Sequence, residues 1–197
     1  MLKETLKNHR VILASGSPRR QAFFKELGID FTVILRPIDE VFPDHLKGAE
    51  ISDYLAVLKA KAFEGDLKSN DILVTSDTIV WYNGIALGKP QNREEALSMI
   101  QGLSGDTHKV ITSVCLTSPN HQIVFNDTTQ VSFVPLIKGE IEYYVDNYEP
   151  YDKAGAYGIQ EWIGSIAISK IEGSYNNVVG LPTQKLYETL KDFASAS

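Results

Sequence analysis

The sequence predicts an α/β fold built on a mixed β-sheet. Apolar runs of strand length alternate along the chain with amphipathic stretches at helical spacing, and this alternation favours helices packed on a sheet. Residues 108–117 and 122–134 are two strand-like segments joined only by a Ser-Pro-Asn-His turn. Strands that follow each other so closely pair in antiparallel fashion, so we expect both parallel and antiparallel pairs in the sheet.

The first strand, turn and helix are predicted within residues 11–28. Residues 11–13 are an apolar run, and the small residues from Ser15 to Ser17 form the turn that follows. Ser17 is a natural helix N-cap, and the proline after it suits the first helical position, where its missing N–H is no loss. Two phenylalanines and a leucine then give the helix an apolar face, and a glycine ends it.

Arg19 and Arg20 lie in the first turn of this helix, at the positive end of the helix dipole, where acidic residues are preferred. One interpretation is that a polyanion binds there, held by free backbone N–H groups and two guanidinium groups. The other is that both arginines are solvated or paired with nearby acids. The local sequence leaves both interpretations open.

A strand over residues 31–35 and a helix over residues 51–63 come next. The polar loop between them carries Glu40, which is either a functional carboxylate beyond a strand end or a solvated loop residue. The helix has apolar residues at helical spacing, and Tyr54 belongs to its predicted buried face. Its lysines, Lys59 among them, would ordinarily face solvent.

Residues 72–82 predict a long and mostly apolar strand with Asp77 in its middle. Aspartate is rare in strands and costly to bury without a partner. Asp77 either lies at a strand break that lets it reach water, or is a carboxylate that the sheet presents for catalysis or metal binding, which we favour. An Asn-Gly hairpin and a return strand over residues 85–87 follow, a geometry that allows Lys89 to fold back toward Asp77.

The alternation continues to the end of the chain. A strand is predicted over residues 165–171, and helices are predicted over residues 93–103, 140–148 and 182–193.

A loop of small residues spans residues 151–160. Its two glycines allow close backbone approach, and its polar side chains are Asp152, Lys153 and Gln160. A loop of this kind either reads the polar edge of a flat ligand through its amide or is a plain tight turn.

Composition excludes several classes of protein. The 197 residues carry a net charge of −6, which argues against a general nucleic-acid binder. Cys115 is the single cysteine, so a disulfide or a cysteine-based zinc site within one chain is excluded. No apolar run reaches membrane-spanning length and the N-terminus lacks the apolar core of a signal peptide, so we expect a cytoplasmic protein. His108 has no acid or cysteine at catalytic spacing and is expected to be structural.

The familiar phosphate-loop, dinucleotide-binding, zinc-protease and serine-hydrolase motifs are absent. The remaining candidates for chemistry are basic residues (Arg19, Arg20, Lys59, Lys89, Lys153) and acidic residues (Glu40, Asp77, Asp152). Cleavage of a phosphoanhydride needs both kinds, because cations neutralise the phosphates while carboxylates hold a divalent metal and orient water.

Five sequence blocks resemble, in order, the signature blocks of the Maf family of nucleotide pyrophosphatases: LASGSPRR, SDTIVWYNGIALGKP, LSGDTHKVIT, DKAGAYGIQ and GSYNNVVGLP. The resemblance runs from about Ile12 to Leu190. It implies one Maf-type domain over residues 1–197, with two lobes around a long mixed sheet, as in inosine-triphosphatase-like proteins, and an active site in the cleft between the lobes. It also implies hydrolysis of a nucleoside triphosphate to the monophosphate and pyrophosphate, with Mg²⁺ or Mn²⁺.

The resemblance also implies roles for individual residues. Asp77 matches the catalytic carboxylate that accepts a proton from the attacking water, and Glu40 matches an acidic residue that places metal or water. Metal ligation is thus expected from Glu40 and Asp77. Residues that match groups contacting the triphosphate are Ser15, Ser17, Arg20, Lys59 and Lys89. Lys59 is preferred to Lys61, because the family's LAxxKA pattern aligns with residues 55–60.

Arg19, Thr78 and Gln160 match the branch of the family that resembles dTTP and UTP pyrophosphatases. The branch acting on 7-methyl-GTP has glutamate where Gln160 stands. An amide both donates and accepts, which matches the imide edge of uracil or thymine, whereas a carboxylate only accepts and suits a donor-rich guanine edge.

We therefore expect a dTTP/UTP pyrophosphatase, a homodimer by family resemblance, with no nucleic-acid or membrane partner. Two alternatives remain open. One is a nucleotide-binding regulator of cell division whose hydrolysis is incidental, and the other is a pyrophosphatase for modified pyrimidine triphosphates.

Overall fold

The computed structural model describes residues 1–196, which form two compact units. Unit 1 comprises Met1–Asp77, Thr112–Asp127 and the described residues from Gly180 on. Unit 2 comprises Thr78–Ile111 and Thr128–Val179.

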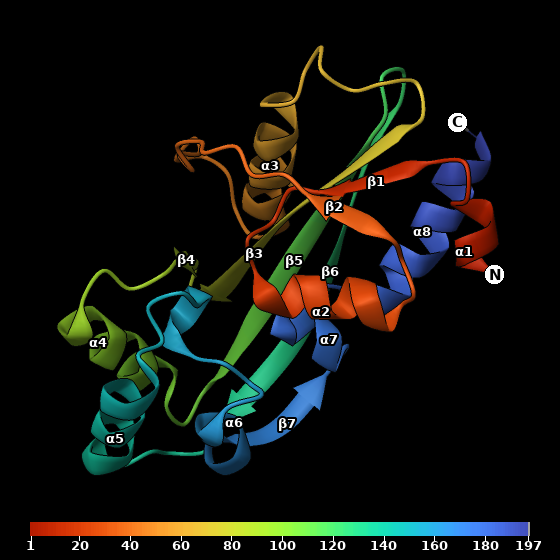
Figure 1. The fold of residues 1–197 in the computed structure, drawn as a ribbon. Helices are drawn as coiled ribbons and strands as arrows, with labels where there is room; N and C mark the ends of the chain where they lie inside the picture. The colour runs from red at the N-terminus through yellow and green to blue at the C-terminus, as the bar shows by residue number, and fades with distance from the viewer. Residues whose placement is uncertain (197) are drawn as a thin grey trace. The chain divides into compact units, whose positions relative to one another are not determined.

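Within residues 1–196, seven strands form one sheet in the order β2-β1-β3-β5-β6-β7, with β4 paired to β3 (Figure 1). The strands are β1 (Arg10–Leu13), β2 (Phe31–Val33), β3 (Asp71–Tyr82), β4 (Ile85–Leu87), β5 (Thr107–Thr117), β6 (Gln122–Phe133) and β7 (Ile168–Glu172). β1 is parallel to β2 and β3, whereas the β3–β4 and β6–β7 pairs are antiparallel. The prediction of an α/β fold on a mixed sheet is therefore confirmed.

The helices accompany these strands in chain order. They are α1 (Leu2–Thr5), α2 (Pro18–Glu26), α3 (Ala49–Lys61), α4 (Arg93–Leu103), α5 (Lys138–Tyr148), the 3-10 turn η1 (Ala154–Ala156), α6 (Trp162–Ala167), α7 (Tyr175–Val179) and α8 (Thr183–Ala196). No helix within residues 1–196 combines the length and the apolar character that crossing a bilayer requires.

In unit 1, successive strand residues pack on opposite faces of the sheet, as the strand period of two requires. Val11 and Ile72 belong to a buried cluster with side chains of α1, α2 and α8. Ile12, Leu73 and Cys115 belong to a second cluster with side chains of α3. Both faces of the sheet in unit 1 are thus covered, which explains the continuous apolar runs at residues 11–13 of β1 and 72–74 of β3.

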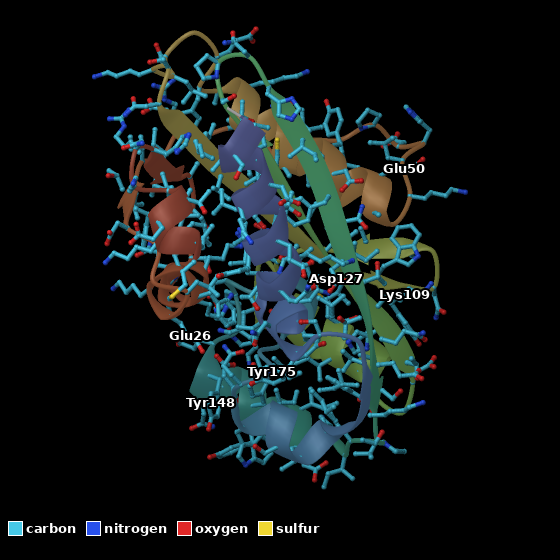
Figure 2. The ribbon with its side chains drawn as sticks, turned by 90° about the vertical axis from the view of Figure 1, so that its right-hand side faces the viewer. Glu26, Glu50, Lys109, Asp127, Tyr148 and Tyr175 are labelled. Carbon is cyan, nitrogen blue, oxygen red and sulfur yellow. The ribbon has the colours of Figure 1, made fainter. Side chains whose placement is uncertain are left out.

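The two ends of the described chain meet in unit 1, where α1 packs beside α8 (Figure 1). Lys185 of α8 is tied to β6, because its Nζ lies 2.7 Å from Asp127 Oδ1 and donates to the Asn126 carbonyl at 3.0 Å (Asp127 is labelled in Figure 2). With a single turn, α1 is too short for hydrophobic periodicity to predict.

Unit 2 has its own core. Apolar residues of β3, β5 and β6, such as Val80, Val110 and Val131, pack there with the buried faces of α4, α5 and α6. α4 and α5 lie side by side in this unit (Figure 1).

Two sequence expectations for individual segments are wrong. Residues 165–171 are not one strand, because α6 extends to Ala167 and β7 begins only at Ile168. Ile163 and Ala167 are both buried and four residues apart, a helical spacing that the run of small and β-branched residues obscured.

The second wrong expectation concerns the buried face of α3. Tyr54 was expected on that face but is 37% exposed, while Ser52 lies there instead. Ser52 is satisfied there, since its hydroxyl accepts from Ser113 at 2.7 Å and donates to the Ala49 carbonyl at 3.2 Å.

His108 is a buried structural residue of unit 2, as expected. Its Nε2 lies 2.7 Å from the Tyr157 hydroxyl, and its ring packs edge-on against Phe133. Burial lowers the pKa of His108 to about 4, although the nearby Asp106 carboxylate opposes the shift.

Stability should therefore depend on pH through His108. Between pH 6.5 and 4 the unfolded chain binds a proton at this residue that the folded chain does not bind, so stability falls as the pH falls. The loss should reach about 3 kcal/mol below pH 4. Urea unfolding of the wild type and His108→Gln at pH 7, 6, 5 and 4 measures this contribution. Equal pH dependence in the two proteins would contradict it.

Candidate functional site

Asp77 is the last residue of unit 1 on β3, and it is only 6% exposed. A carboxylate buried to this degree needs a partner. Lys59 of α3 supplies one, since its Nζ lies 2.6 Å from Asp77 Oδ1. Lys61, the alternative that the sequence offered, is exposed.

Lys59 also joins Asp77 to the loop that carries Glu40. The Lys59 Nζ lies 3.0 Å from Glu40 Oε1 and donates to the Ser76 carbonyl at 3.4 Å. One ammonium group therefore holds two carboxylates and the middle of a strand. The structure brings together Glu40, Lys59 and Asp77, which three separate segments of the sequence contribute.

Arg20 of α2 ties three segments of unit 1 to one another. Its Nε donates to the Gly180 carbonyl at 2.9 Å, and its Nη1 donates to the Ser76 carbonyl at 3.0 Å and to Ser15 Oγ at 3.4 Å. Neither interpretation of the first-turn arginines had included these carbonyl contacts. Both Arg20 and Lys59 donate to the residue that precedes Asp77, so two cations fix the backbone beside the carboxylate.

Several charges act on the Arg20 guanidinium. Burial lowers the pKa of Arg20, the Asp77 and Glu40 carboxylates raise it, and the neighbouring Arg19 lowers it. An arginine keeps its charge through shifts of this kind. The first turn of α2 therefore contributes positive charge to the neighbourhood of both carboxylates.

The turn before α2 is held by its serines. Ser15 is buried, and its hydroxyl accepts from the Ser17 N–H at 3.3 Å as well as from Arg20. Ser17 caps α2, as predicted, because its hydroxyl accepts from the Arg20 N–H at 3.4 Å. Gln21 adds a bond from its amide nitrogen to the Ser15 carbonyl at 3.3 Å.

The Glu40 and Asp77 carboxylates of unit 1 are ligands of the kind that a hard divalent cation prefers. Among residues 1–196 no group of three or more His, Cys, Asp or Glu side chains is placed to hold a metal. Glu40 and Asp77 nevertheless both lie within 3.0 Å of a single ammonium nitrogen, so their oxygens converge on one positive charge. Mg²⁺ is commonly held by one or two carboxylates, with substrate phosphates and water supplying the other ligands. The pair therefore fits a metal that arrives with a phosphate ligand.

The other three predicted residues, Thr78, Lys89 and Gln160, belong to unit 2. Thr78 is half-buried, whereas the side chains of Lys89 and Gln160 are exposed. The Gly155 N–H donates to the Gly88 carbonyl at 3.0 Å, which links the segment before Lys89 to the loop that ends at Gln160. The expectation that Lys89 folds back toward Asp77 stays a prediction.

A polar network joins this loop of unit 2 to α5. Lys153 is only 8% exposed, and its Nζ lies 2.6 Å from Asp152 Oδ1 and 3.0 Å from Glu161 Oε1. The Tyr144 hydroxyl donates to Glu161 Oε2 and accepts from the Gly158 N–H at 3.0 Å. Burial raises the pKa of Tyr144, and the bond to Glu161 raises it further.

Sequence reasoning missed Tyr144 and Glu161. One signal was available for Tyr144, which shares the buried face of α5 with Ile141 and Val145. A tyrosine at such a position needs a hydrogen-bond partner for its hydroxyl. No comparable signal singled out Glu161.

Comparison with known proteins supplies a family and relatives. Residues 10–193 match the model of a family described as Maf-like protein. A Christiangramia forsetii protein named dTTP/UTP pyrophosphatase is 60% identical over 196 residues, covering 100% of both chains. Proteins with the same name from Flavobacterium johnsoniae and Bacteroides fragilis are 58% and 49% identical, covering 96% and 94% of this chain and 98% and 97% of their own.

Two solved structures show weaker similarity. A nucleoside-triphosphatase / dITP/XTP pyrophosphatase from Mycobacterium abscessus has a TM-score of 0.43 at 12% identity, covering 95% of this chain and 97% of its own. The Staphylococcus aureus Ham1 protein has a TM-score of 0.45 at 17% identity, covering 95% and 98%.

The loop of unit 2 should tolerate no side chain at Gly155. Gly155 has φ +68°, and an added Cβ would lie 2.8 Å from Val80 Cγ2, whereas Gly84 has φ +79° with open space around it. Gly155→Ala should lower the free energy of unfolding by about 2–4 kcal/mol, because backbone strain and overpacking add. Gly84→Ala should lose only the strain, about 1–2 kcal/mol. Urea unfolding of both variants measures the difference, and equal losses would contradict the packing argument.

Proposed function

Because the chain belongs to the Maf family, we propose that it is a nucleoside triphosphate pyrophosphatase whose substrates are dTTP and UTP. The products are the nucleoside monophosphate and pyrophosphate. The names of relatives that match along nearly the whole chain support the substrate. The observation in the molecule that carries the proposal is the Lys59 ammonium between the Glu40 and Asp77 carboxylates.

The proposed reaction is an in-line displacement at the α-phosphorus. A new bond forms between a water oxygen and the α-phosphorus, and the bond to the bridging oxygen breaks. Pyrophosphate leaves with the electron pair. Asp77 accepts the proton from the attacking water, and Lys59 fixes the orientation of its carboxylate by binding Oδ1.

Cations of the chain bind the triphosphate in this proposal. The residues assigned to this role are Ser15, Ser17, Arg20, Lys59 and Lys89. Lys59 is suited to it because its ammonium has three donors on a flexible stem, so it is able to bind a phosphate oxygen while it stays paired with Asp77. Arg20 also has a structural role, since its bonds to the Ser76 and Gly180 carbonyls fix the middle of β3 beside the segment at Gly180.

Glu40 and Asp77 are the residues that would hold Mg²⁺ or Mn²⁺. Such an ion, when bound, neutralises charge on the triphosphate oxygens and makes bound water more acidic.

Arg19, Thr78 and Gln160 are proposed to select the base. The amide of Gln160 both donates and accepts, which suits the imide edge of uracil and thymine. Leaving one buried polar group of a wrong base without its partner costs about 1–3 kcal/mol, so this contact alone would discriminate roughly tenfold to a hundredfold. The homodimer, the single domain over residues 1–197 and the cytoplasmic location stay predictions.

A panel of nucleotides tests the proposed activity. With Mg²⁺ or Mn²⁺, the protein should release pyrophosphate from dTTP and UTP with kcat/KM at least about tenfold above that for 7-methyl-GTP. Release of orthophosphate instead of pyrophosphate would contradict cleavage at the α-phosphorus. Equal or faster turnover of 7-methyl-GTP would contradict the proposed specificity. Modified pyrimidine triphosphates in the same panel show whether they are the better substrates.

Asp77→Asn tests the proposed proton acceptor. The amide has the shape of the carboxylate but accepts a proton poorly, so kcat should fall by about 10²–10⁴-fold. Asp66→Asn is a matched control, because Asp66 is also paired with a cation, Arg36 at 2.6 Å, yet is exposed. Pyrophosphate release measures activity, and circular dichroism checks the fold. Asp77→Asn protein with wild-type kcat would remove Asp77 from its role.

A further inference from the structure

We propose that a mostly buried three-residue network positions the side chain of Gln160 for base selection. The network consists of Tyr144, Lys153 and Glu161, all within unit 2. It holds the preceding loop so that the Gln160 amide, rather than the neighbouring Glu161 carboxylate, is available to the substrate base. The inference rests on the proposed function, because it explains how the same site would read a pyrimidine.

Both carboxylate oxygens of Glu161 are engaged within unit 2. Oε1 lies 3.0 Å from Lys153 Nζ, and Oε2 accepts from the Tyr144 hydroxyl. The Lys153 side chain is 9% exposed and that of Glu161 is 19% exposed, so solvent screens this pair weakly. The carboxylate next to Gln160 in the chain is thus directed into the unit.

The Tyr144 hydroxyl also reaches the backbone of the turn that presents Gln160. The Glu161 N–H donates to the Gly158 carbonyl at 3.0 Å, which closes a turn over residues 158–161. The Gly158 N–H donates to the Tyr144 hydroxyl at 3.0 Å, so one hydroxyl holds the first residue of the turn and the side chain of the last. Within this turn Ile159 is buried and Gln160 is exposed. The orientation of the turn therefore decides whether the Ile159 or the Gln160 side chain is exposed at the surface of the unit.

The backbone before the turn does not adopt its conformation unaided. Ala156 has φ +60°, a left-handed conformation that a residue with a Cβ rarely adopts. Contacts around it must maintain this conformation. The network packs directly on the next glycine, because a Cβ at Gly158 would lie 2.9 Å from Glu161 Cδ and 3.0 Å from Lys153 Cε.

The chemistry of Gln160 and Glu161 explains why it matters which of these two side chains faces the substrate base. The imide edge of uracil or thymine presents an N–H between two carbonyl oxygens. An amide complements a donor and an acceptor of this edge, whereas a carboxylate accepts from the N–H and repels the carbonyls. A free Glu161 carboxylate beside Gln160 would thus favour donor-rich bases, and the network prevents this by binding both of its oxygens.

Tyr144→Phe tests the inference, since it keeps the ring and removes the hydroxyl that joins Gly158 to Glu161. KM for dTTP should rise about tenfold while kcat stays within about twofold, because base contacts form in the ground state as well as in the transition state. The preference for dTTP over dGTP in kcat/KM should fall about tenfold. Tyr148→Phe is the matched control, because Tyr148 stacks on the Tyr144 ring and reaches the surface (Figure 2), and its KM should not change.

A double-mutant cycle with Gln160→Ala separates positioning from a merely structural role. In the Gln160→Ala background, Tyr144→Phe should leave KM unchanged, because the amide that it positions is gone. A structural role would impair both backgrounds equally, and that result would overturn the inference. Glu161→Gln, which keeps an oxygen that accepts from Tyr144, should retain KM within about threefold, whereas Glu161→Leu should reproduce the loss.

The outcomes distinguish the two proposals. Wild-type protein that releases no pyrophosphate from dTTP or UTP overturns the proposed function, and the positioning role with it. Active wild-type protein combined with an unchanged KM in Tyr144→Phe overturns the positioning role alone. If circular dichroism shows that Tyr144→Phe is unfolded, Lys153→Met replaces it in the same cycle, with the same result expected.

Discussion

The ion pair between Lys59 and Asp77 is the interaction on which the rest of unit 1 depends. Asp77 is nearly buried, and without an ammonium 2.6 Å away its desolvation would be strongly unfavourable. Removing either partner of such a pair leaves an uncompensated buried charge, which is more destabilising than loss of a surface ion pair. The middle of β3, the helix α3 and the loop with Glu40 must therefore keep their places together. The geometry proposed for catalysis is thus the same geometry that allows the carboxylate to be buried.

The residue repeats of strand β3 and helix α3 bring Lys59 and Asp77 together. Residues of β3 alternate between the faces of the sheet, and Leu73 packs toward α3. Two residues on, the Thr75 hydroxyl donates to the Ala56 carbonyl of α3 at 2.7 Å, and Asp77 is the next residue on that face. On α3, Ala56 is followed at helical spacing by Lys59. A strand period of two and a helical spacing of three thus place the Asp77 carboxylate opposite the Lys59 ammonium.

These periods explain how much the sequence could predict. Most of the strands, the longer helices and the Ser17 cap could be predicted, because each leaves a local pattern of residue types, and Asp77 was distinctive as a carboxylate within an apolar strand. Glu40 and Lys59 have no such pattern, and only the resemblance to the Maf family assigned them. The acceptors of Arg20 could not be, since backbone carbonyls have no signature in a sequence. The bond from Tyr144 to Glu161 joins a helix to a distant loop, and only the need of a buried hydroxyl for a partner hinted at it. The helix α6 was missed because its small and β-branched residues also suit a strand.

A lysine shared by two carboxylates occurs in both units, with different consequences. In unit 2, the Glu161 carboxylate binds both the Lys153 ammonium and the Tyr144 hydroxyl. The same hydroxyl accepts from the Gly158 N–H, so the turn over residues 158–161 is fixed as well. In unit 1, the partners of Lys59 are two carboxylates and a carbonyl, acceptors with which a triphosphate would compete. An ammonium that is shared among several acceptors is therefore able to bind a phosphate oxygen as well, as the proposed function requires of Lys59. The same kind of ion pair would then contribute to substrate binding in unit 1, and keep a competing carboxylate away from the substrate in unit 2.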